Sequence, residues 1–226
     1  MQEDLLPMLA SGFAETLYMV VLSTLAAVVL GLPLGVLVVL TAPGHLEDSP
    51  RLHRALGTII NIARSFPFII LIVLLLPLSR FLVGTTLGAT AAVVPLSIAA
   101  APFVGRLIEN SLKEVEWGKV EAALAMGAST LQIVVKVLIP EALPSLVLGL
   151  TLAIITITGF TATAGAIGAG GLGSLAIRYG YMRYREDVML ATVVLLVIFV
   201  QAVQWGGDRL ARRIDTKHHR SSKDRI

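Results

Sequence analysis

The sequence predicts an all-α membrane protein with five transmembrane helices. Of its 226 residues, 56% are hydrophobic and only 15% are charged, and the mean hydropathy is +0.84. Soluble domains contain about 25% charged residues, so this composition excludes an ordinary soluble domain. A helix needs roughly 20 apolar residues to cross about 30 Å of hydrocarbon. Five segments reach that length, and the predicted spans cover residues 16–40, 58–79, 83–106, 143–166 and 188–208.

The first predicted span, residues 16–40, contains no charged side chain. Within it, Gly31 and Gly35 have the GxxxG spacing that lets a second helix approach closely. A helix kinked at Pro33, with incidental glycines, explains the same residues equally well. The preceding segment, residues 1–11, begins with acidic residues and leads into an apolar run too long for a signal peptide, so we expect no cleavage.

The later spans are assigned by the same criterion of length. Residues 58–79 carry one charge, Arg64, near one end, where a long side chain can reach the membrane surface. Residues 83–106 and 188–208 are uncharged except at their last positions. The remaining apolar run continues to Ile177 and is longer than one crossing. We therefore assign residues 143–166 to the membrane and the glycine-rich remainder to a turn.

The distribution of lysine and arginine predicts the orientation. With the amino terminus outside, the cytoplasmic segments hold 13 of these residues, as two, four and seven in succession, and the outer segments hold four. Arg64 is not counted. Because cytoplasmic loops are enriched in cations, we expect a periplasmic segment over residues 1–11, a transmembrane domain over residues 12–208 and a basic cytoplasmic tail over residues 209–226.

A charged interruption between the third and fourth spans predicts a helix, a sharp corner and a short helix. Residues 117–126 are good helix formers, and Ala122 and Ala123 are small enough for another protein's backbone to come close. Gly127 can adopt the left-handed conformation that ends a helix.

The second half of this interruption contains a new helix start. Ser129 and Gln132 have the spacing of a capping box. Pro140 and Pro144 mark the return to apolar sequence, at positions where a missing amide donor matters least.

This interruption resembles the EAA loop of ABC-type importer permeases, on the residues Glu121-Ala122-Ala123-Leu124-Ala125-Met126-Gly127 and the later Val137-Leu138-Ile139-Pro140. Other stretches resemble the methionine-importer branch of that family: Ala63-Arg64-Ser65-Phe66-Pro67-Phe68, Ala100-Ala101-Pro102-Phe103, the glycine-rich residues 165–173, and Arg178-Tyr179-Gly180-Tyr181. The carboxyl tail, residues 217–226, departs from the family pattern because it is longer and more basic.

The resemblance implies the type I ABC importer permease fold and a transport role in the bacterial inner membrane. By this resemblance the chain carries methionine, with the L form as the expected substrate and the D form left open, while two cytoplasmic ATPase subunits bind ATP and Mg. It also implies a second copy of this chain and a periplasmic or lipid-anchored binding protein, and no nucleic acid. Five helices are too few to enclose a solute path, which a two-fold axis between two copies would supply. The implied coupling residues are Glu121, Ala122, Ala123, Gly127, Ser129, Gln132 and Pro140.

Two further groups of residues are candidates for function. The fourth span is rich in hydroxyls that could line a solute path or bond back to their own helix carbonyls: Thr156, Thr158, Thr161 and Thr163, with Phe160 among them. Cations and tyrosines after that span could contact a binding protein or form an ordinary interfacial belt: Arg178, Tyr179, Tyr181, Arg183 and Arg185.

The sequence lacks the residues that nucleotide binding, metal binding and enzyme catalysis would require. Residues 168–173 match GxGxxG, but they follow a predicted membrane helix rather than a strand, and Ser174 stands where a phosphate-binding loop needs lysine. There is no cysteine, and the four histidines show no metal-ligand spacing, so we expect neither metal nor cofactor. No acid–base set lies in the spans, which argues against a membrane enzyme. A passive channel and an ABC permease for another small solute remain as alternatives.

Overall fold

The computed structural model describes residues 5–223, and their side chains as far as Asp215. The regular secondary structure of these residues is all helical, and they include no strand. The elements in order are α1 Leu5–Leu40, α2 Pro50–Ser65, α3 Phe68–Val83, α4 Ala89–Lys113, α5 Trp117–Ala125, α6 Thr130–Ile133, the π-helix η1 Val134–Leu138, α7 Ile139–Glu141, α8 Leu143–Ala166, α9 Gly171–Leu175, the π-helix η2 Ala176–Tyr181 and α10 Glu186–Lys223.

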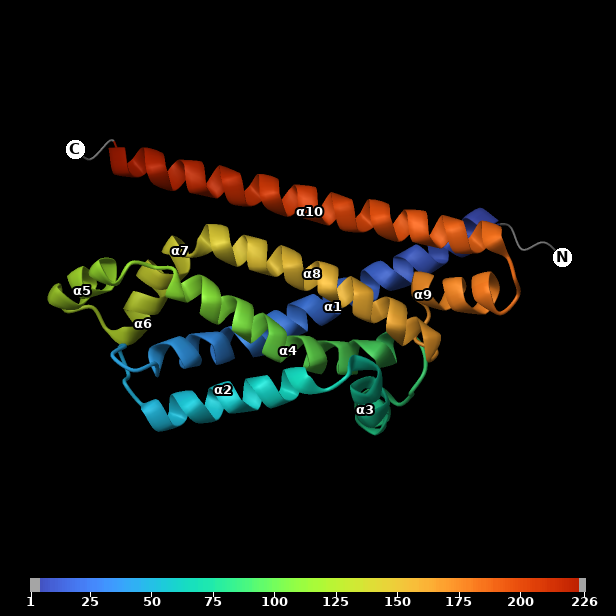
Figure 1. Cartoon of the computed structure of the whole chain (residues 1–226), viewed down its shortest axis with the longest axis horizontal. Helices are drawn as coiled ribbons and strands as arrows, with labels where there is room; N and C mark the ends of the chain where they lie inside the picture. Colours follow the sequence, from blue (N-terminus) through green and yellow to red (C-terminus); the bar gives the residue numbers. More distant parts are fainter. Residues whose placement is uncertain (1–4, 224–226) are drawn as a thin grey trace.

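The long helices α1, α4, α8 and α10 run along the long axis of the molecule (Figure 1). Each lies in a segment long and apolar enough to cross a membrane. One end of the molecule holds α5, α6 and the carboxyl end of α10, and the opposite end holds the start of α1, α3 and α9 (Figure 1). The start of α1 and the end of α10 therefore lie at opposite ends of the helix bundle.

The second predicted span, residues 58–79, is not one helix. It divides into α2 and α3, whose axes differ by 101°. Phe66 is extended, with φ −70° and ψ 129°, because a residue that precedes proline avoids the helical region, and Pro67 itself donates no amide hydrogen. Four helices qualify as spans alone, and the count reaches the predicted five when this bent pair serves as one broken crossing.

Other helix limits differ from the predicted spans because hydropathy measures the apolar stretch and not the helix. Helix α1 begins at Leu5 rather than residue 16, since its only early breaker, Pro7, lies in the first turn, where proline is tolerated. Helix α4 begins at Ala89 rather than residue 83, because Gly84 ends α3 in the left-handed conformation. Helix α10 continues through part of the predicted tail to Lys223. Helix α8 has the predicted limits.

The GxxxG interpretation of the first span is confirmed, because α1 crosses α4 at Gly31 and Gly35. A Cβ atom on Gly31 would lie 2.8 Å from the Ala101 carbonyl oxygen, and one on Gly35 would lie 2.6 Å from the Gly105 carbonyl oxygen. Both distances are too short for any side chain. The glycines therefore allow a backbone-to-backbone approach that other residues would prevent.

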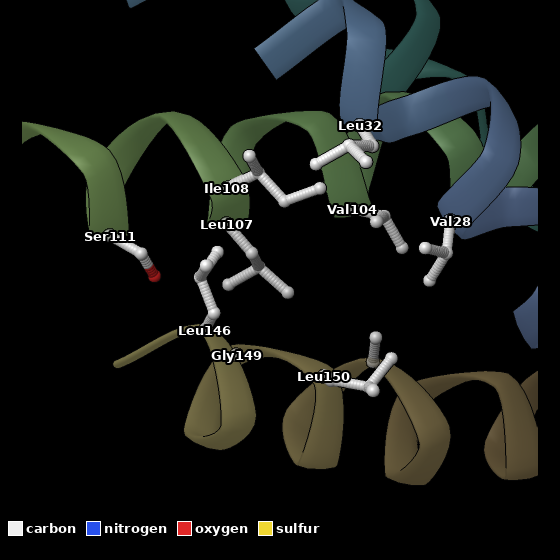
Figure 2. Close-up of a pocket in the computed structure, with 10 residues that line it drawn as sticks. Val28, Leu32, Val104, Leu107, Ile108, Ser111, Leu146, Gly149 and Leu150 are labelled. Carbon is white, nitrogen blue, oxygen red and sulfur yellow. The ribbon is translucent and has the colours of Figure 1, made fainter. Parts of the chain in front are cut away.

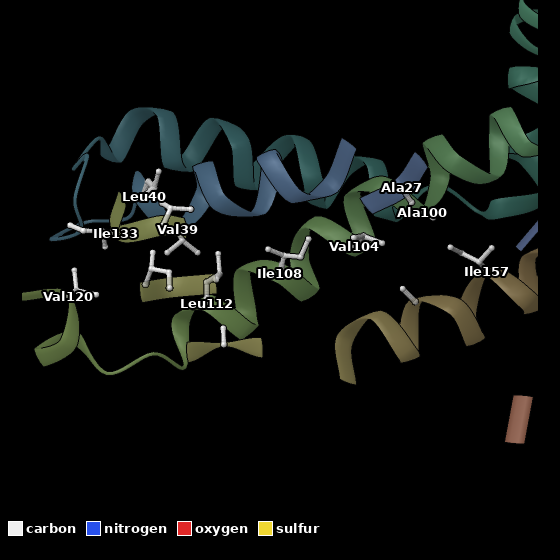
Figure 3. Close-up of a cluster of buried hydrophobic side chains, with 14 of the residues drawn as sticks. Ala27, Val39, Leu40, Ala100, Val104, Ile108, Leu112, Val120, Ile133 and Ile157 are labelled. Carbon is white, nitrogen blue, oxygen red and sulfur yellow. The ribbon is translucent and has the colours of Figure 1, made fainter. Parts of the chain in front are cut away.

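The main core continues from this crossing to the end of the molecule that holds α5 and α6. Figure 3 shows Val39 of α1 and Leu112 of α4 beside Val120 of α5 and Ile133 of α6. Each of these side chains is buried. The charged interruption of the sequence is therefore anchored in the core.

Candidate functional site

The predicted corner between α5 and α6 is confirmed in its backbone. Helix α5 ends at Ala125, and Gly127 has φ +77°, in the left-handed region. The Ser129 amide donates to Gln132 Oε1 at 2.9 Å, and the Gln132 amide donates to Ser129 Oγ at 3.4 Å, which completes the capping box. These bonds define the direction in which α6 leaves the corner.

One face of the corner is buried against its own chain. Val120 and Ala123 of α5 and Ile133 of α6 are 1%, 4% and 0% exposed. The expectation that Ala123 accommodates a partner's backbone is therefore wrong, although its neighbour Ala122 is exposed. Successive residues of a helix point about 100° apart, so the two alanines cannot share a face.

The opposite face of the corner is apolar at its tip and polar at its sides. Met126 is 82% exposed and Leu131 is 72% exposed, and Glu121 and Gln132 are also exposed. Exposed apolar residues bordered by polar ones mark protein interaction sites. Methionine suits such a contact because its flexible side chain adapts to a partner's surface.

The corner is also joined to the segment that leads into α8. Lys119 Nζ lies 2.7 Å from Glu141 Oε2, and this hydrogen bond raises the pKa of the Lys119 ammonium. Between these residues the chain forms η1, which ends two residues before Pro140. Proline donates no amide hydrogen, so the turn ahead of it widens into a π-helix. Pro140 therefore shapes the exit from the corner.

The threonines of α8 bond to their own helix. The hydroxyls of Thr156 and Thr158 donate to carbonyls four residues earlier at 2.8 Å, and that of Thr161 donates to Thr158 at 2.7 Å. Thr163 makes the same kind of bond at 3.4 Å. Thr158 and Thr161 are buried. The intrahelical interpretation therefore accounts for these hydroxyls, and a role in a solute path stays a prediction.

Phe160 has a different role in the fold from its threonine neighbours. Its ring stacks on Phe68 of α3, with centroids 4.2 Å apart and planes 7° from parallel. This contact attaches the second half of the bent α2–α3 pair to α8.

At the opposite end of the molecule, some of the predicted cations and tyrosines come together. Arg178 and Tyr179 border an open groove of about 580 Å³, together with Glu15 of α1. The Arg183 guanidinium lies 4.7 Å from the Tyr179 ring centre, whereas Arg185 pairs with Asp187 at 2.7 Å. Tyr181 is 69% exposed. These residues form a polar surface rather than one converging site.

The glycine-rich segment forms the predicted tight turn. Gly168, Gly170 and Gly171 all have positive φ. The Gly171 amide donates to Glu15 Oε2 at 2.6 Å, and the Leu172 amide donates to Thr16 Oγ1 at 2.9 Å. Because side chains of α1 already accept from these amides, the turn does not present them to a phosphate.

Helices α1, α4 and α8 enclose an apolar cavity of about 160 Å³ (Figure 2). Val28, Leu107 and Leu150 are among its lining residues, and its one hydroxyl, on Ser111, accepts from Ser145 at 3.1 Å. A charged solute would find no partner for its charges there, and burying an unpaired charge is costly. This cavity is therefore unsuited to an amino acid zwitterion.

A buried carboxylate near the end of α4, Glu109, was not among the residues predicted from the sequence. Glu109 is 1% exposed and lies 2.6 Å from both Arg106 and Lys113. Arg106 also donates to Asn61 Oδ1 of α2 at 2.7 Å. The spacing of three and four residues on one helix face was the available signal. The cluster joins α2 to α4.

Residues 31–216 match the family described as "Binding-protein-dependent transport system inner membrane component". The chain is 49% identical over 201 residues to the probable D-methionine transport system permease protein MetI of Vibrio cholerae, covering 89% of each chain. It is 47% identical to the methionine import system permease protein MetP of Bacillus subtilis, covering 80% of this chain and 82% of the relative.

Two solved structures of ABC transporters are also similar to this chain. A chain of the MetNI methionine ABC transporter in an inward-facing conformation matches with a TM-score of 0.92 and 48% identity, covering 95% of this chain and 99% of that one. A chain from an amino acid ABC transporter crystallised with histidines matches with a TM-score of 0.68 at 20% identity, which supports the fold alone.

Proposed function

Because this chain belongs to the family of binding-protein-dependent transport system inner membrane components, we propose that it is the permease subunit of an ATP-driven methionine importer. The observation that carries the proposal is its 47–49% identity to methionine permeases over most of its length. Both L- and D-methionine are expected substrates, since the relatives include permeases named for D-methionine.

In this proposal the energy comes from two cytoplasmic ATPase subunits, which bind ATP and Mg. A second copy of the chain completes the solute path, and a periplasmic or lipid-anchored binding protein delivers methionine to the outer end. Arg178, Tyr179, Tyr181, Arg183 and Arg185 contact that protein. Thr156 and Thr163, which are partly exposed on α8, face the path between the two copies.

The α5–α6 corner is the proposed contact with the ATPase. Its apolar tip, Met126 and Leu131, enters a groove of the partner, and Glu121 and Gln132 meet polar groups at the rim. Apolar contacts at the centre of an interface supply most of the affinity, and rim charges set orientation and association rate.

Charge reversal tests this contact. Glu121→Lys is expected to weaken ATPase association and methionine import, because it reverses the charge at the rim. The matched control is Glu114→Lys, since Glu114 is also exposed and its side chain makes no hydrogen bond or ion pair within the described residues. Equal copurification of the ATPase with both variants would show that the corner is not part of the interface.

Substrate identity is tested by uptake. In a methionine auxotroph, deletion of this gene is expected to reduce uptake of labelled L-methionine at low external concentration, and the intact gene should restore it. Excess unlabelled D-methionine should compete. Normal methionine uptake together with lost uptake of another solute would transfer the assignment to an ABC permease for that solute.

A further inference from the structure

We propose that the loop between α1 and α2, residues 41–49, is a second mechanical link that carries movement of the α5–α6 corner to α1 and α2. This inference rests on the proposed function, since it assumes that the ATPase moves the corner. It makes His45 and Glu47 of this loop, with their partners Trp117 and Thr130, positioning residues for coupling. None of the four belongs to the exposed tip proposed to enter the ATPase.

The 41–49 loop contacts the first residue of each helix of the corner. Glu47 Oε1 accepts a hydrogen bond from Thr130 Oγ1 at 2.8 Å, and Thr130 is the first residue of α6. The His45 ring meets Trp117, the first residue of α5, edge to face at 5.0 Å between ring centres. Two contacts at separate helices restrain both the position and the rotation of the loop relative to the corner.

The loop is stiff enough to transmit a displacement because its own backbone is bonded. The Glu47 amide donates to the Leu40 carbonyl at 2.9 Å, and the Ser49 amide donates to the Thr41 carbonyl at 3.2 Å. The Gly44 amide donates to Asp48 Oδ2 at 3.1 Å. Glu47, which holds the corner, is thus bonded directly to the last residue of α1.

The link also reaches α2. His53 Nδ1 of α2 lies 2.9 Å from the Val38 carbonyl oxygen of α1, so the start of α2 is attached to the end of α1. A displacement of Glu47 therefore moves both helices. The covalent connections of the corner lead to α4 through residues 114–116 and to α8 through η1 and α7. Side chains of α1 also pack against the corner in the core, and the loop adds a polar and aromatic link from the corner to α1 and α2.

The first test removes the Glu47–Thr130 bond in the whole transporter, assembled with its ATPase and binding protein in liposomes. We measure ATP hydrolysed per methionine imported. Thr130→Val and Glu47→Ala are each expected to raise this ratio by a factor of roughly two to thirty, the range found for changes along coupling routes. The double variant should raise the ratio no further than the single variants do, because all three lack the same bond.

Conservative variants distinguish a positioning role of these residues from an effect on folding. Thr130→Ser keeps the hydroxyl and Glu47→Gln keeps a carbonyl acceptor, so both should retain the wild-type ratio. Glu114→Ala is the matched control and should also leave it unchanged. If the wild-type transporter imports methionine and Thr130→Val keeps the wild-type ratio, the inference is overturned while the proposed function stands. A wild-type transporter that imports no methionine refutes the proposed function instead.

The second test uses the absence of cysteine from the chain. Glu47→Cys together with Thr130→Cys introduces the only two thiols of this chain, which a short bifunctional thiol reagent can join. If the loop moves with the corner as one body, the joined transporter keeps importing methionine. If joining them stops import and cleavage of a reducible linker restores it, the loop separates from the corner during the cycle and the inference is wrong.

Discussion

Gly127 shows how one residue determines the shape of a functional surface. Its φ of +77° turns the chain between α5 and α6, and no atom lies within 4 Å of a Cβ built on it. The requirement for glycine at this corner is therefore a requirement of the backbone and not of space.

Substitution of Gly127 should impair coupling in proportion to backbone strain. Gly127→Val is expected to cost about 1–2 kcal/mol, because a β-branched residue fits the left-handed region poorly. Gly127→Asn should cost less, since asparagine is enriched there. Methionine import by the assembled transporter should fall in the order wild type, Asn, Val. Wild-type import by a correctly inserted and assembled Gly127→Val transporter would contradict this role.

His45 should make the stability of the 41–49 loop depend on pH. Burial, and secondarily the charge of Lys113, lower the pKa of its imidazole below the ordinary value of about 6.5. The folded state thus favours the neutral ring, and its contribution is present above about pH 6.5 and is lost as pH falls through the lowered pKa.

The measurement is thermal unfolding of the detergent-solubilised protein between about pH 7.5 and pH 5. Wild type should lose stability on acidification, and His45→Gln should lose less, because it removes this titration. An identical pH dependence in both proteins would show that His45 does not contribute.

At the scale of elements, the α1–α4 crossing and the apolar cavity are neighbouring regions that should respond in opposite ways to a larger side chain. The crossing depends on Gly35, whose Cβ would meet the Gly105 carbonyl. The cavity is bordered by Gly149, whose Cβ would lie 3.4 Å from the Leu107 Cβ, an ordinary contact.

Alanine substitutions should distinguish the two sites. Gly35→Ala is expected to destabilise the protein by about 1–3 kcal/mol through overpacking. Gly149→Ala should be neutral or stabilising by up to about 1 kcal/mol, because alanine is the better helix former and the cavity has room. Unfolding of both variants in detergent measures the difference. Equal stability of the two would argue against a tight α1–α4 crossing.

For the whole molecule, the positions of α1, α9 and α10 at the two ends of the helix bundle support a testable orientation in the membrane. Helix α9 lies at the end that holds the start of α1, and α10 runs to the opposite end (Figure 1). Gly180 belongs to η2, which follows α9 directly. Together with the excess of 13 cations over four, this arrangement predicts an amino terminus outside and a carboxyl terminus in the cytoplasm.

Reporter fusions check this topology. A reporter joined after Ile226 should be active only when it requires the cytoplasm, and one inserted at Gly180 only when it requires the periplasm. Reversal of either result would invert the orientation and place the α5–α6 corner out of reach of a cytoplasmic ATPase.

The sequence by itself determined the features that depend on neighbouring residues. Apolar length predicted a membrane protein, and α8 has the predicted limits because proline and glycine bound the apolar run. The shape of the corner was also predictable, since a left-handed glycine and a capping box act within a few residues. Phe66-Pro67 contained the signal for the broken second span, but hydropathy averages over such a break.

Only the tertiary structure decided which residues meet across the fold. Thr130 and Glu47 are 83 positions apart, and Gly171 and Glu15 are 156 apart. It also decided that Ala123 faces the core while Ala122 faces outward, and that the glycines of α1 meet Gly105. A local signal acts through a few successive dihedral angles, whereas these contacts depend on how whole helices cross, which is determined by the packing of all their side chains together.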